Sequence, residues 1–472
     1  MDFLDLNDQQ RKIVEQGDGV VMVKAGPGTG KTKTLISRVA YLILEKHINP
    51  ANILTLTFTQ RAALEMKERL NLILGSNLPT ITTFHGLAFN FLTGLVGEIK
   101  IISEEDQETL LKKVAGKSKV KISPRALSVI ISQHKSTTNP SKKDSEMERL
   151  IVDYNKALNQ QQLLDFDDLL MQMYKSLEEK NDKRRQLKNL YQYILIDEFQ
   201  DTNDLQYQII KMILKDSPNL FVIGDPFQSI YGFRGASAEV FKTLKDDFSA
   251  VCEETLGINY RSHSNVVQIS NLLFPQSLTL QPASKKGGKV SLVKTLNEYS
   301  EADWVIRFIS DKIGGTDLLK AQHLVTQVNF SDFAVVFRAH HLSGVLRKQF
   351  EESGMPYQIV KEDTPVEGDH IKLLSMHAAK GLEFKFVFIC GFEEGLIPYI
   401  KNEADLEEEK RLLYVAMTRA KEELYLLYAK KRQKKPNQVS RFKTLLEHPN
   451  FLEVEDEAIT KIIKKSQISL FN

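Results

Sequence analysis

Residues 20–32, VVMVKAGPGTGKT, have the types and the spacing of a site that binds phosphate. The run Val20 to Val23 predicts a short buried strand, and TKTLISRVAYLI after the glycines predicts a helix. Gly28 and Gly30 would let the backbone turn its N–H groups around an anion, and the start of the helix adds the positive end of its dipole. The order strand, glycine-rich loop and helix predicts a P-loop; a glycine turn that happens to precede a helix is the alternative.

Two side chains at the end of this loop would act on the phosphates of a nucleotide. Lys31 would reach the β- and γ-phosphates, and the Thr32 hydroxyl would take a Mg²⁺ position. Ala25 stands where the pattern usually has its first glycine. The candidate nucleotide contacts in the loop are Ala25, Gly26, Pro27, Gly28, Thr29, Gly30, Lys31, Thr32 and Lys33.

Two carboxylates come at the end of the predicted strand YILID, residues 193–197. Asp197 would hold Mg²⁺ through its water shell, and Glu198 would orient or deprotonate the attacking water. An acidic turn is the alternative for the pair alone, but the P-loop upstream favours nucleotide hydrolysis. Gln228 follows the next apolar run, LFVIGD, where an amide would sense the γ-phosphate.

Three more polar residues are candidates for contacts to a nucleotide. Gln10 lies in a short helix that Asn7 would cap, and its amide has the donor and acceptor that suit the edge of adenine. Arg261 follows a tyrosine, and Arg419 lies in VAMTRAK. The ordinary interpretation of a single arginine is that it forms an ion pair on the protein surface. If the two halves of the chain close over one nucleotide, both arginines would reach the γ-phosphate as arginine fingers.

The strands that must position these residues alternate with helices, which predicts an α/β fold. ILTLTFT (53–59) and TITTF (80–84) are further strands of the first half, and KVSLV, FAVVFR, IKLLSM, KFVFICGF and ELYLLYA are strands of the second. Phe58, Thr59 and His85 would lie at carboxyl ends of strands, where open α/β sheets bind ligands. In IYGFRGA, the residues Tyr231, Phe233 and Arg234 offer ring faces and charge to a polynucleotide strand.

Between about residues 96 and 187 the pattern changes to charged helices. Its basic residues either form a solvated helix face or contact nucleic acid. They are Lys112, Lys113, Lys117, Lys119, Lys121, Arg125 and Lys135. The carboxylates of Asp165, Asp167 and Asp168 suggest either a metal cluster or the acidic start of an amphipathic helix, which the helix dipole favours.

Composition limits the class of protein. The chain has 472 residues, 42% of them hydrophobic and 26% charged, as in an ordinary globular protein, and a formal net charge of +2. No stretch reaches the roughly 18 uncharged apolar residues of a membrane span, and the polar N-terminus is no secretory signal. We expect a cytoplasmic protein in which Cys252 and Cys390 are small core residues.

Ten segments follow one another along the chain: LNDQQ, AGPGTGKT, TFTQRAALEM, TFHGLA, DFDDLL, LIDEFQDTN, VIGDPFQSIYGFRGA, NYRS, MHAAKGLEF and YVAMTRAKEELYL. They occur in the order found in superfamily 1A DNA helicases, and the chain resembles the UvrD/Rep/PcrA family over about residues 3–443. One such motif is weak, but ten in order are specific.

The resemblance implies two RecA-like motor domains, parallel sheets flanked by helices, with ATP and Mg²⁺ as cofactors and single-stranded DNA as partner. The first motor domain would be residues 1–95 and 188–260, a helical insertion 96–187, the second motor domain 261–446 and a tail 447–472. It further implies that Gln10 reads adenine, Tyr260 stacks on it and Glu383 meets the ribose. The hydrolytic residues would be Lys31, Thr32, Asp197, Glu198, Gln228, Arg261 and Arg419, and the residues of DNA-contacting motifs Phe58, Thr59, His85, Tyr231, Phe233, Arg234, Arg338, Ser375 and His377.

Two departures from the family pattern bear on activity. Phe233 stands where the family usually has tryptophan, so a stacking surface is smaller. Only residues 358–370 separate Tyr357 from the strand that starts at Ile371, where larger relatives place an accessory domain. We therefore expect a motor without that domain, whose unwinding is either constitutive or dependent on a partner that supplies a wedge.

The tail ends in Gln467-Ile468-Ser469-Leu470-Phe471, which resembles the peptide that binds the bacterial sliding clamp. Gln467, Leu470 and Phe471 would be its anchors. An ordinary frayed terminus is the alternative.

Three functions are consistent with the sequence. The first is an ATP-driven 3′-to-5′ DNA translocase and helicase in DNA repair or replication. The second is the motor subunit of a nuclease-helicase assembly, for instance in phage defence. The third is a DNA-binding scaffold that does not hydrolyse ATP, which would require a broken catalytic residue, yet Lys31, Glu198, Arg261 and Arg419 are intact. Stacking and phosphate contacts alone do not distinguish DNA from RNA.

Overall fold

The computed structural model describes residues 5–117, 121–139, 145–179, 182–232, 235, 239–275, 279–314, 328–361, 364–400 and 405–456. The chain divides into two units. Unit 1 consists of Met1–Ala25 and Gly30–Leu256, and unit 2 of Gly26–Thr29 and Gly257–Asn472.

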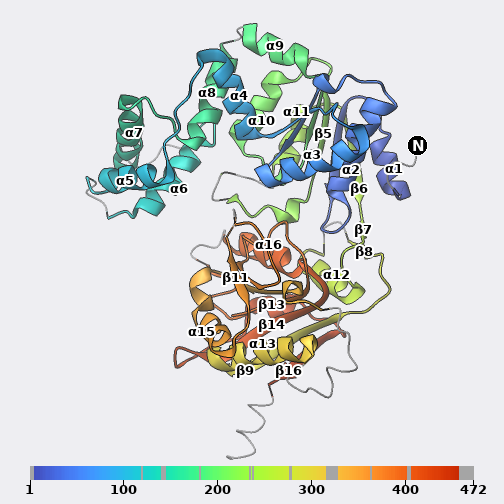
Figure 1. Ribbon diagram of the computed structural model, residues 1–472, viewed down its shortest axis with the longest axis vertical. Coiled ribbons are helices and arrows are strands. Elements are labelled where there is room, and N and C mark those ends of the chain that lie inside the picture. The colour runs from blue at the N-terminus through green and yellow to red at the C-terminus, as the bar shows by residue number, and fades with distance from the viewer. Residues whose placement is uncertain are drawn as a thin grey trace, which may run out of the picture. The chain divides into compact units, whose positions relative to one another are not determined.

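A six-stranded sheet forms the centre of unit 1 (Figure 1). Its strands run parallel in the order β3 (Thr80–Thr83), β2 (Ile53–Thr57), β4 (Tyr193–Ile196), β5 (Asn219–Gly224), β1 (Val20–Ala25) and β6 (Val251–Leu256). Because all strands are parallel, their carboxyl ends meet at one edge of the sheet.

Helices cover both faces of this sheet, which explains why its central strands β1, β4 and β5 are largely apolar. Val20 and Met22 of β1 pack into one core together with helices α4, α8, α10 and α11. Val21 and Val23 point to the opposite face and pack against helices α1, α2 and α3. The alternation follows from the period of two along a strand.

The helices of unit 1 begin and end as follows: α1 (Asp8–Val14), α2 (Lys31–Leu44), α3 (Gln60–Leu74), α4 (Phe84–Val96), α5 (Glu104–Ala115), α6 (Pro124–Lys135), α7 (Ser145–Gln160), α8 (Phe166–Glu178), α9 (Asp182–Leu190), α10 (Asp204–Ile213) and α11 (Val240–Asp247). The predicted cap of α1 is confirmed, since Asn7 and Gln10 form a capping box.

Helices α5, α6 and α7 lie together and share a small core of their own (Figure 1). Beside it the Lys135 ammonium is buried and lies 2.7 Å from both Asp165 Oδ2 and Asp168 Oδ1. Asp165 and Asp168 also form the capping box of α8, so the predicted acidic helix start is confirmed. The described residues contain no group of three or more His, Cys, Asp or Glu side chains placed to hold a metal. Lys135 therefore belongs to a buried ion cluster, not to a solvated face.

A second parallel sheet forms the centre of unit 2. Its strand order is β11 (Tyr357–Val360), β12 (Ile371–Ser375), β10 (Phe333–Phe337), β13 (Phe384–Ile389), β14 (Ala420–Arg432), β9 (Lys289–Asn297) and β16 (Phe451–Glu455), and β15 (Lys435–Pro436) pairs antiparallel with β14. β7 (Ile258–Asn259) pairs with β8 (Gln281–Pro282) separately. Helices α13 (Glu298–Ile313) and α15 (Gly344–Ser353) pack on the core, and α12 (Ser264–Asn271) and α16 (Asp405–Met417) also contact the sheet.

The strands β11 and β12 are neighbours in the sheet and are joined only by residues 361–370. The buried Lys372 holds this connection, because its ammonium donates to Gln358 Oε1 at 2.9 Å and to the carbonyl oxygens of Glu367 and Gly368. A segment this short cannot contain a folded domain.

The α/β fold and the predicted strands in both halves are confirmed, with ends shifted by a few residues. The expectation for the cysteines is right for the buried Cys390 and wrong for Cys252, which is exposed. Cys252 lies on β6, which among the described residues pairs with β1 alone and forms the edge of the sheet, where the helices cover the faces less completely than at the centre. Among the described residues no helix is both long and apolar enough to cross a bilayer.

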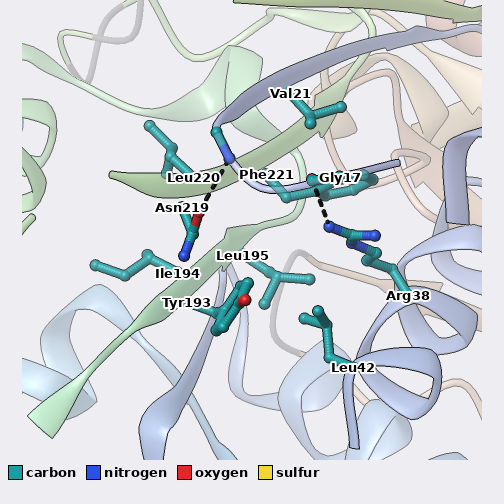
Figure 2. A pocket seen from close by; sticks show the side chains of 11 residues that line it. Gly17, Val21, Arg38, Leu42, Tyr193, Ile194, Leu195, Asn219, Leu220 and Phe221 are labelled. Carbon is teal, nitrogen blue, oxygen red and sulfur yellow. Dashed lines mark hydrogen bonds between the residues drawn. The ribbon is translucent and has the colours of Figure 1, made fainter. Parts of the chain in front are cut away.

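A small pocket lies where strands β1, β4 and β5 begin (Figure 2). Arg38 of α2 lines it and donates hydrogen bonds to the carbonyl oxygens of Val14, at 2.8 Å, and Gly17, at 3.1 Å. Asn219 accepts from the Gly19 N–H at 2.9 Å. These contacts fix the entry to β1 at the amino ends of the strands, opposite the edge that carries the candidate site.

We expect Lys135→Met to destabilise the full chain by about 3 to 5 kcal/mol, because it leaves the buried Asp165 and the partly buried Asp168 without their cation. Lys112→Met is the matched control: Lys112 pairs with Glu108 on the exposed surface of α5 and should cost less than about 1 kcal/mol. Denaturant unfolding measures both. Equal effects would show that the buried cluster adds nothing to stability.

Candidate nucleotide site and nucleic-acid contacts

The backbone of the predicted P-loop has the shape that an anion site requires. Gly28 has φ +70° and Gly30 has φ +86°, conformations that other residues adopt only with strain. Gly30 is the N-cap residue of α2 and supplies no side-chain cap. The first N–H groups of α2 therefore lack the side-chain acceptor that usually satisfies a helix start, and a phosphate would provide one.

Gln10 lies directly against this loop. A carbon added to Gly30 would be only 2.6 Å from Gln10 Nε2, so Gly30 leaves the space that the amide occupies. Gln10 is buried at 3% exposure, and its Oε1 accepts from the Asn7 N–H at 3.2 Å. The structure thus brings together Gln10 and the start of α2, as the sequence predicted for a nucleotide site.

Lys31, the first residue of α2, lies near the carboxylates at the neighbouring strand ends. Its Nζ donates to the Ala25 carbonyl at 3.3 Å. Asp197 is 5% exposed, and its Oδ1 has no hydrogen-bond partner. Burial and the neighbouring Glu198 raise the pKa of Asp197, whereas the charge of Lys31 lowers it. A buried carboxylate oxygen without a partner suits a hard cation, so these residues fit Mg²⁺ bound together with a nucleotide.

Glu198 follows in a strained backbone conformation, with φ +49° and ψ +45°. Such a conformation costs of order 1 kcal/mol or more in a non-glycine residue and persists where the surroundings enforce it. The Glu198 carboxylate accepts a hydrogen bond from Gln200 Nε2. Gln200 was not among the residues that the sequence singled out.

Gln228 lies at the end of the next strand in the 3₁₀ turn Pro226–Gln228. Its Nε2 donates to Asp225 Oδ2 at 2.8 Å, and both side chains are buried. Burial raises the pKa of Asp225, and the charge of Lys31 again opposes the shift. Since β4, β5 and β1 are adjacent in the sheet, Lys31, Asp197, Glu198 and Gln228 gather at one edge.

Unit 2 holds the two candidate arginine fingers with its own acceptors. Arg261 Nε donates to Glu383 Oε2 at 2.7 Å, and Glu383 also pairs with Lys421 at 2.6 Å. Although burial acts in the opposite direction, the Lys421 hydrogen bond and the charge of Arg261 lower the pKa of Glu383. Arg419 is 2% exposed, and its guanidinium donates to the carbonyl oxygens of Val415, at 2.9 Å, and Leu382, at 3.2 Å.

Asn259 is a second residue that the sequence analysis missed. Its Nδ2 donates to the Pro27 carbonyl at 2.8 Å, and its Oδ1 accepts from the N–H groups of Arg261 and Ser262. The Tyr260 N–H donates to the Gly28 carbonyl at 2.8 Å, and the Tyr260 side chain is 53% exposed. One amide thus joins the loop segment Gly26–Thr29 to the backbone of Arg261. The only signal in the sequence was its place beside Tyr260 and Arg261.

Aromatic pairs occur at two of the predicted nucleic-acid positions. Phe58 stacks on Tyr231 with ring centroids 5.1 Å apart, and Tyr231 is 7% exposed. Tyr231 therefore does not offer an open ring face, because Phe58 packs on it. His85 stacks on Phe166 at 4.3 Å, and Phe166 is 56% exposed. Phe166 was missed as a candidate, although an exposed aromatic at a helix start is a recognisable signal.

The other predicted nucleic-acid residues have defined places. Thr59 caps α3 by accepting from the Ala62 N–H at 3.1 Å. Ser375 ends β12, and His377 follows two residues later. Arg338 makes a bidentate ion pair with the buried Glu409: its Nε donates to Oε2 at 3.0 Å and its Nη2 to Oε1 at 2.6 Å. Their contact with DNA stays a prediction. Phe233, Arg234, Gln467, Leu470 and Phe471 lie outside the described residues, and clamp binding by the last three stays a prediction as well.

Comparison with known protein families identifies the chain. The model of the UvrD/REP helicase N-terminal domain matches residues 6–249, and the model of the UvrD-like helicase C-terminal domain matches 255–364 and 361–431. The chain belongs to the UvrD-like helicases. In this helicase the two matches of the C-terminal model meet where β11 leads into the short connection to β12.

Individual relatives support the family and differ in length. A probable DNA helicase of Mycoplasma pneumoniae is 32% identical over 459 residues, which cover 89% of this chain and 83% of the relative. The ATP-dependent DNA helicases PcrA of Staphylococcus aureus and Staphylococcus epidermidis are 31% and 30% identical over 75% of this chain. This helicase spans about half the length of those PcrA relatives, 50% and 51%.

We expect Asp197→Asn to raise the melting temperature of the nucleotide-free protein while it abolishes Mg²⁺-dependent hydrolysis. The folded state raises the pKa of Asp197, so the ionised carboxylate costs stability. That cost is absent below the unfolded pKa of about 4, grows as the pH rises to the folded value and is complete above it. Melting curves at several pH values should therefore show a gain for Asp197→Asn that disappears in acid. A gain independent of pH would contradict this account.

Proposed function

We propose that this helicase is an ATP-driven motor that translocates 3′-to-5′ on single-stranded DNA and unwinds duplex DNA. The observation that carries the proposal is the gathering of Lys31, Asp197, Glu198 and Gln228 at the carboxyl edge of the unit 1 sheet, next to a helix start without a side-chain cap. Membership of the UvrD-like helicases and the names of the PcrA relatives support ATP and DNA as ligands.

The loop from Ala25 to Lys33 would bind the phosphates, with Lys31 on the β- and γ-phosphates. Thr32 and Asp197 would hold Mg²⁺, which when bound neutralises charge on the phosphates. Glu198 would orient the attacking water, and Gln228 would sense the γ-phosphate. Gln10, Tyr260 and Glu383 would contact adenine and ribose. Arg261 and Arg419 would act as arginine fingers, worth of order 10³–10⁵ in rate.

Single-stranded DNA would bind along the residues Phe58, Thr59, His85, Phe233, Arg234, Arg338, Ser375 and His377. The stacked His85 and Phe166 support this assignment, because Phe166 exposes an aromatic ring beside a motif residue. Stacking of a base on such a ring contributes about 1–3 kcal/mol and accepts any base. We place this activity in cytoplasmic DNA repair or replication.

We expect the purified chain to hydrolyse ATP faster when single-stranded DNA is added. Glu198→Gln should bind ATP and DNA but lose turnover by about 10²- to 10⁴-fold, because it removes the group that activates water. Lys31→Ala is the companion variant and should lose ATP affinity as well. A phosphate-release assay gives both values, and hydrolysis that does not respond to oligonucleotide would refute the motor.

A second candidate is the motor subunit of a larger assembly, such as one with a nuclease. The short connection between β11 and β12 favours it, because the chain has no room there for the accessory domain of larger relatives. A partner would then supply the element that splits the duplex.

An unwinding assay on the isolated chain separates the two candidates. We expect it to open a duplex with a 3′ single-stranded tail and to leave a duplex with a 5′ tail closed. Translocation on single strands without opening of either duplex would favour the partner-dependent motor. Opening of only the 5′-tailed substrate would reverse the proposed polarity.

A further inference from the structure

The side chain of Gln200 lies between the ends of two strands and is completely buried. It belongs to the 3₁₀ turn Phe199–Asp201 that follows β4. Its Nε2 donates to Glu198 Oε2, and its Oε1 accepts from the Asp225 N–H at 2.9 Å. The amide therefore connects the candidate catalytic carboxylate at the end of β4 to the backbone that follows β5.

The chemistry of both partners fixes the orientation of this amide. An ionised carboxylate only accepts hydrogen bonds, and a backbone N–H only donates one. A glutamine satisfies the two partners at once only with its NH₂ toward Glu198 and its oxygen toward Asp225. A glutamate would put two carboxylates together, and methionine would lack both hydrogen bonds, so the position depends on an amide.

The surrounding backbone packs closely against the side chain. A carbon added to Gly224 would lie 2.2 Å from Gln200 Oε1, so the amide packs directly on the last residue of β5. The Ser229 hydroxyl donates to the Gln200 carbonyl at 3.1 Å. The side chain and the main chain of Gln200 are thus both held by the segment from Gly224 to Ser229.

That segment also carries Gln228, the candidate γ-phosphate sensor. Gln228 Nε2 donates to Asp225 Oδ2 at 2.8 Å, and the Asp225 N–H donates to Gln200. A continuous series of hydrogen bonds therefore runs from Glu198 through Gln200 and Asp225 to Gln228. Glu198 itself sits in the left-handed conformation, which the surroundings must stabilise.

We propose that Gln200 is a positioning residue that sets the Glu198 carboxylate for hydrolysis and links it to the segment of Gln228. The proposal rests on the proposed function, since it assigns Gln200 a role in the same ATPase site. Gln200 acts through Glu198 and needs no contact with the nucleotide.

Single-turnover hydrolysis by Gln200→Met in the full chain tests the proposal. We expect the rate of the chemical step to fall about 10²-fold, as for a misplaced catalytic group, with the affinity for a non-hydrolysable ATP analogue unchanged. Binding of ADP with aluminium fluoride, a transition-state mimic, should weaken together with the rate. Gln206→Met is the matched control: Gln206 is also a buried glutamine nearby, but it accepts from the Asn203 N–H in the cap of α10. It should change stability and leave the rate intact.

A double-mutant cycle separates positioning from general structural damage. If Gln200 acts through Glu198, Gln200→Met should cost no additional rate in the Glu198→Gln background. Gly224→Ala leaves Gln200 and Glu198 unsubstituted and should reproduce the loss, because the new methyl group displaces the Gln200 amide. Melting temperatures identify any variant that does not fold.

A wild-type hydrolysis rate in Gln200→Met overturns the inference and leaves the proposed function standing. So does an equal loss of rate when Gln200→Met is introduced into the wild-type chain and into the Glu198→Gln variant. A wild-type chain that does not hydrolyse ATP refutes the proposed function, and the inference falls with it. The two failures are therefore distinguishable.

Discussion

The burial of the Asp197 and Asp225 carboxylates near Lys31 is the constraint on which the site in unit 1 depends. Asp197 and Asp225 both have raised pKa values because they are desolvated, and in both cases the charge of Lys31 acts against the shift. Both side chains lie just after strand ends, yet they are only 5% and 3% exposed, so little water reaches them. The exclusion of water strengthens electrostatic contacts, but it also raises the free energy of any charge that has no partner. The free protein therefore carries a cost in stability that a bound cation and phosphate would relieve.

The elements around the site follow from that constraint. Gly30 stands at the N-cap of α2 in place of a capping side chain and takes φ +86°, which leaves the helix start accessible to an anion. Because Glu198 is strained, the amide of Gln200 and the close approach at Gly224 hold it in place. These features weaken the isolated fold locally. Such local losses of stability are typical of functional sites, where the position of a group is maintained at the expense of the free energy of folding.

The sequence predicted what depends on local pattern. Apolar runs located the strands, since strands covered on both faces need continuous hydrophobic residues, and Gly28 and Gly30 marked the loop because only glycine reaches positive φ without strain. It failed where the answer depends on which strands become neighbours. Cys252 is exposed because β6 lies at the edge of the sheet. Tyr231 is covered because Phe58, which follows β2, stacks on it across the ends of the strands. Gln200 and Asn259 were missed for a related reason, because each joins a near neighbour to a distant partner, Asp225 for Gln200 and Pro27 for Asn259.

The two arginines of unit 2 differ in how easily they could change partners. If they act on a phosphate, each must exchange its present acceptors for phosphate oxygens. Arg261 can leave Glu383 at small cost, because Glu383 keeps its ion pair with Lys421 and is not left as an uncompensated charge. Arg419 is 2% exposed and donates to the carbonyl oxygens of Val415 and Leu382 and to the Thr418 hydroxyl, and these buried acceptors would lose a donor. Arg261 is therefore the side chain that can switch between states, and Arg419 is the one whose position the fold of unit 2 fixes in advance.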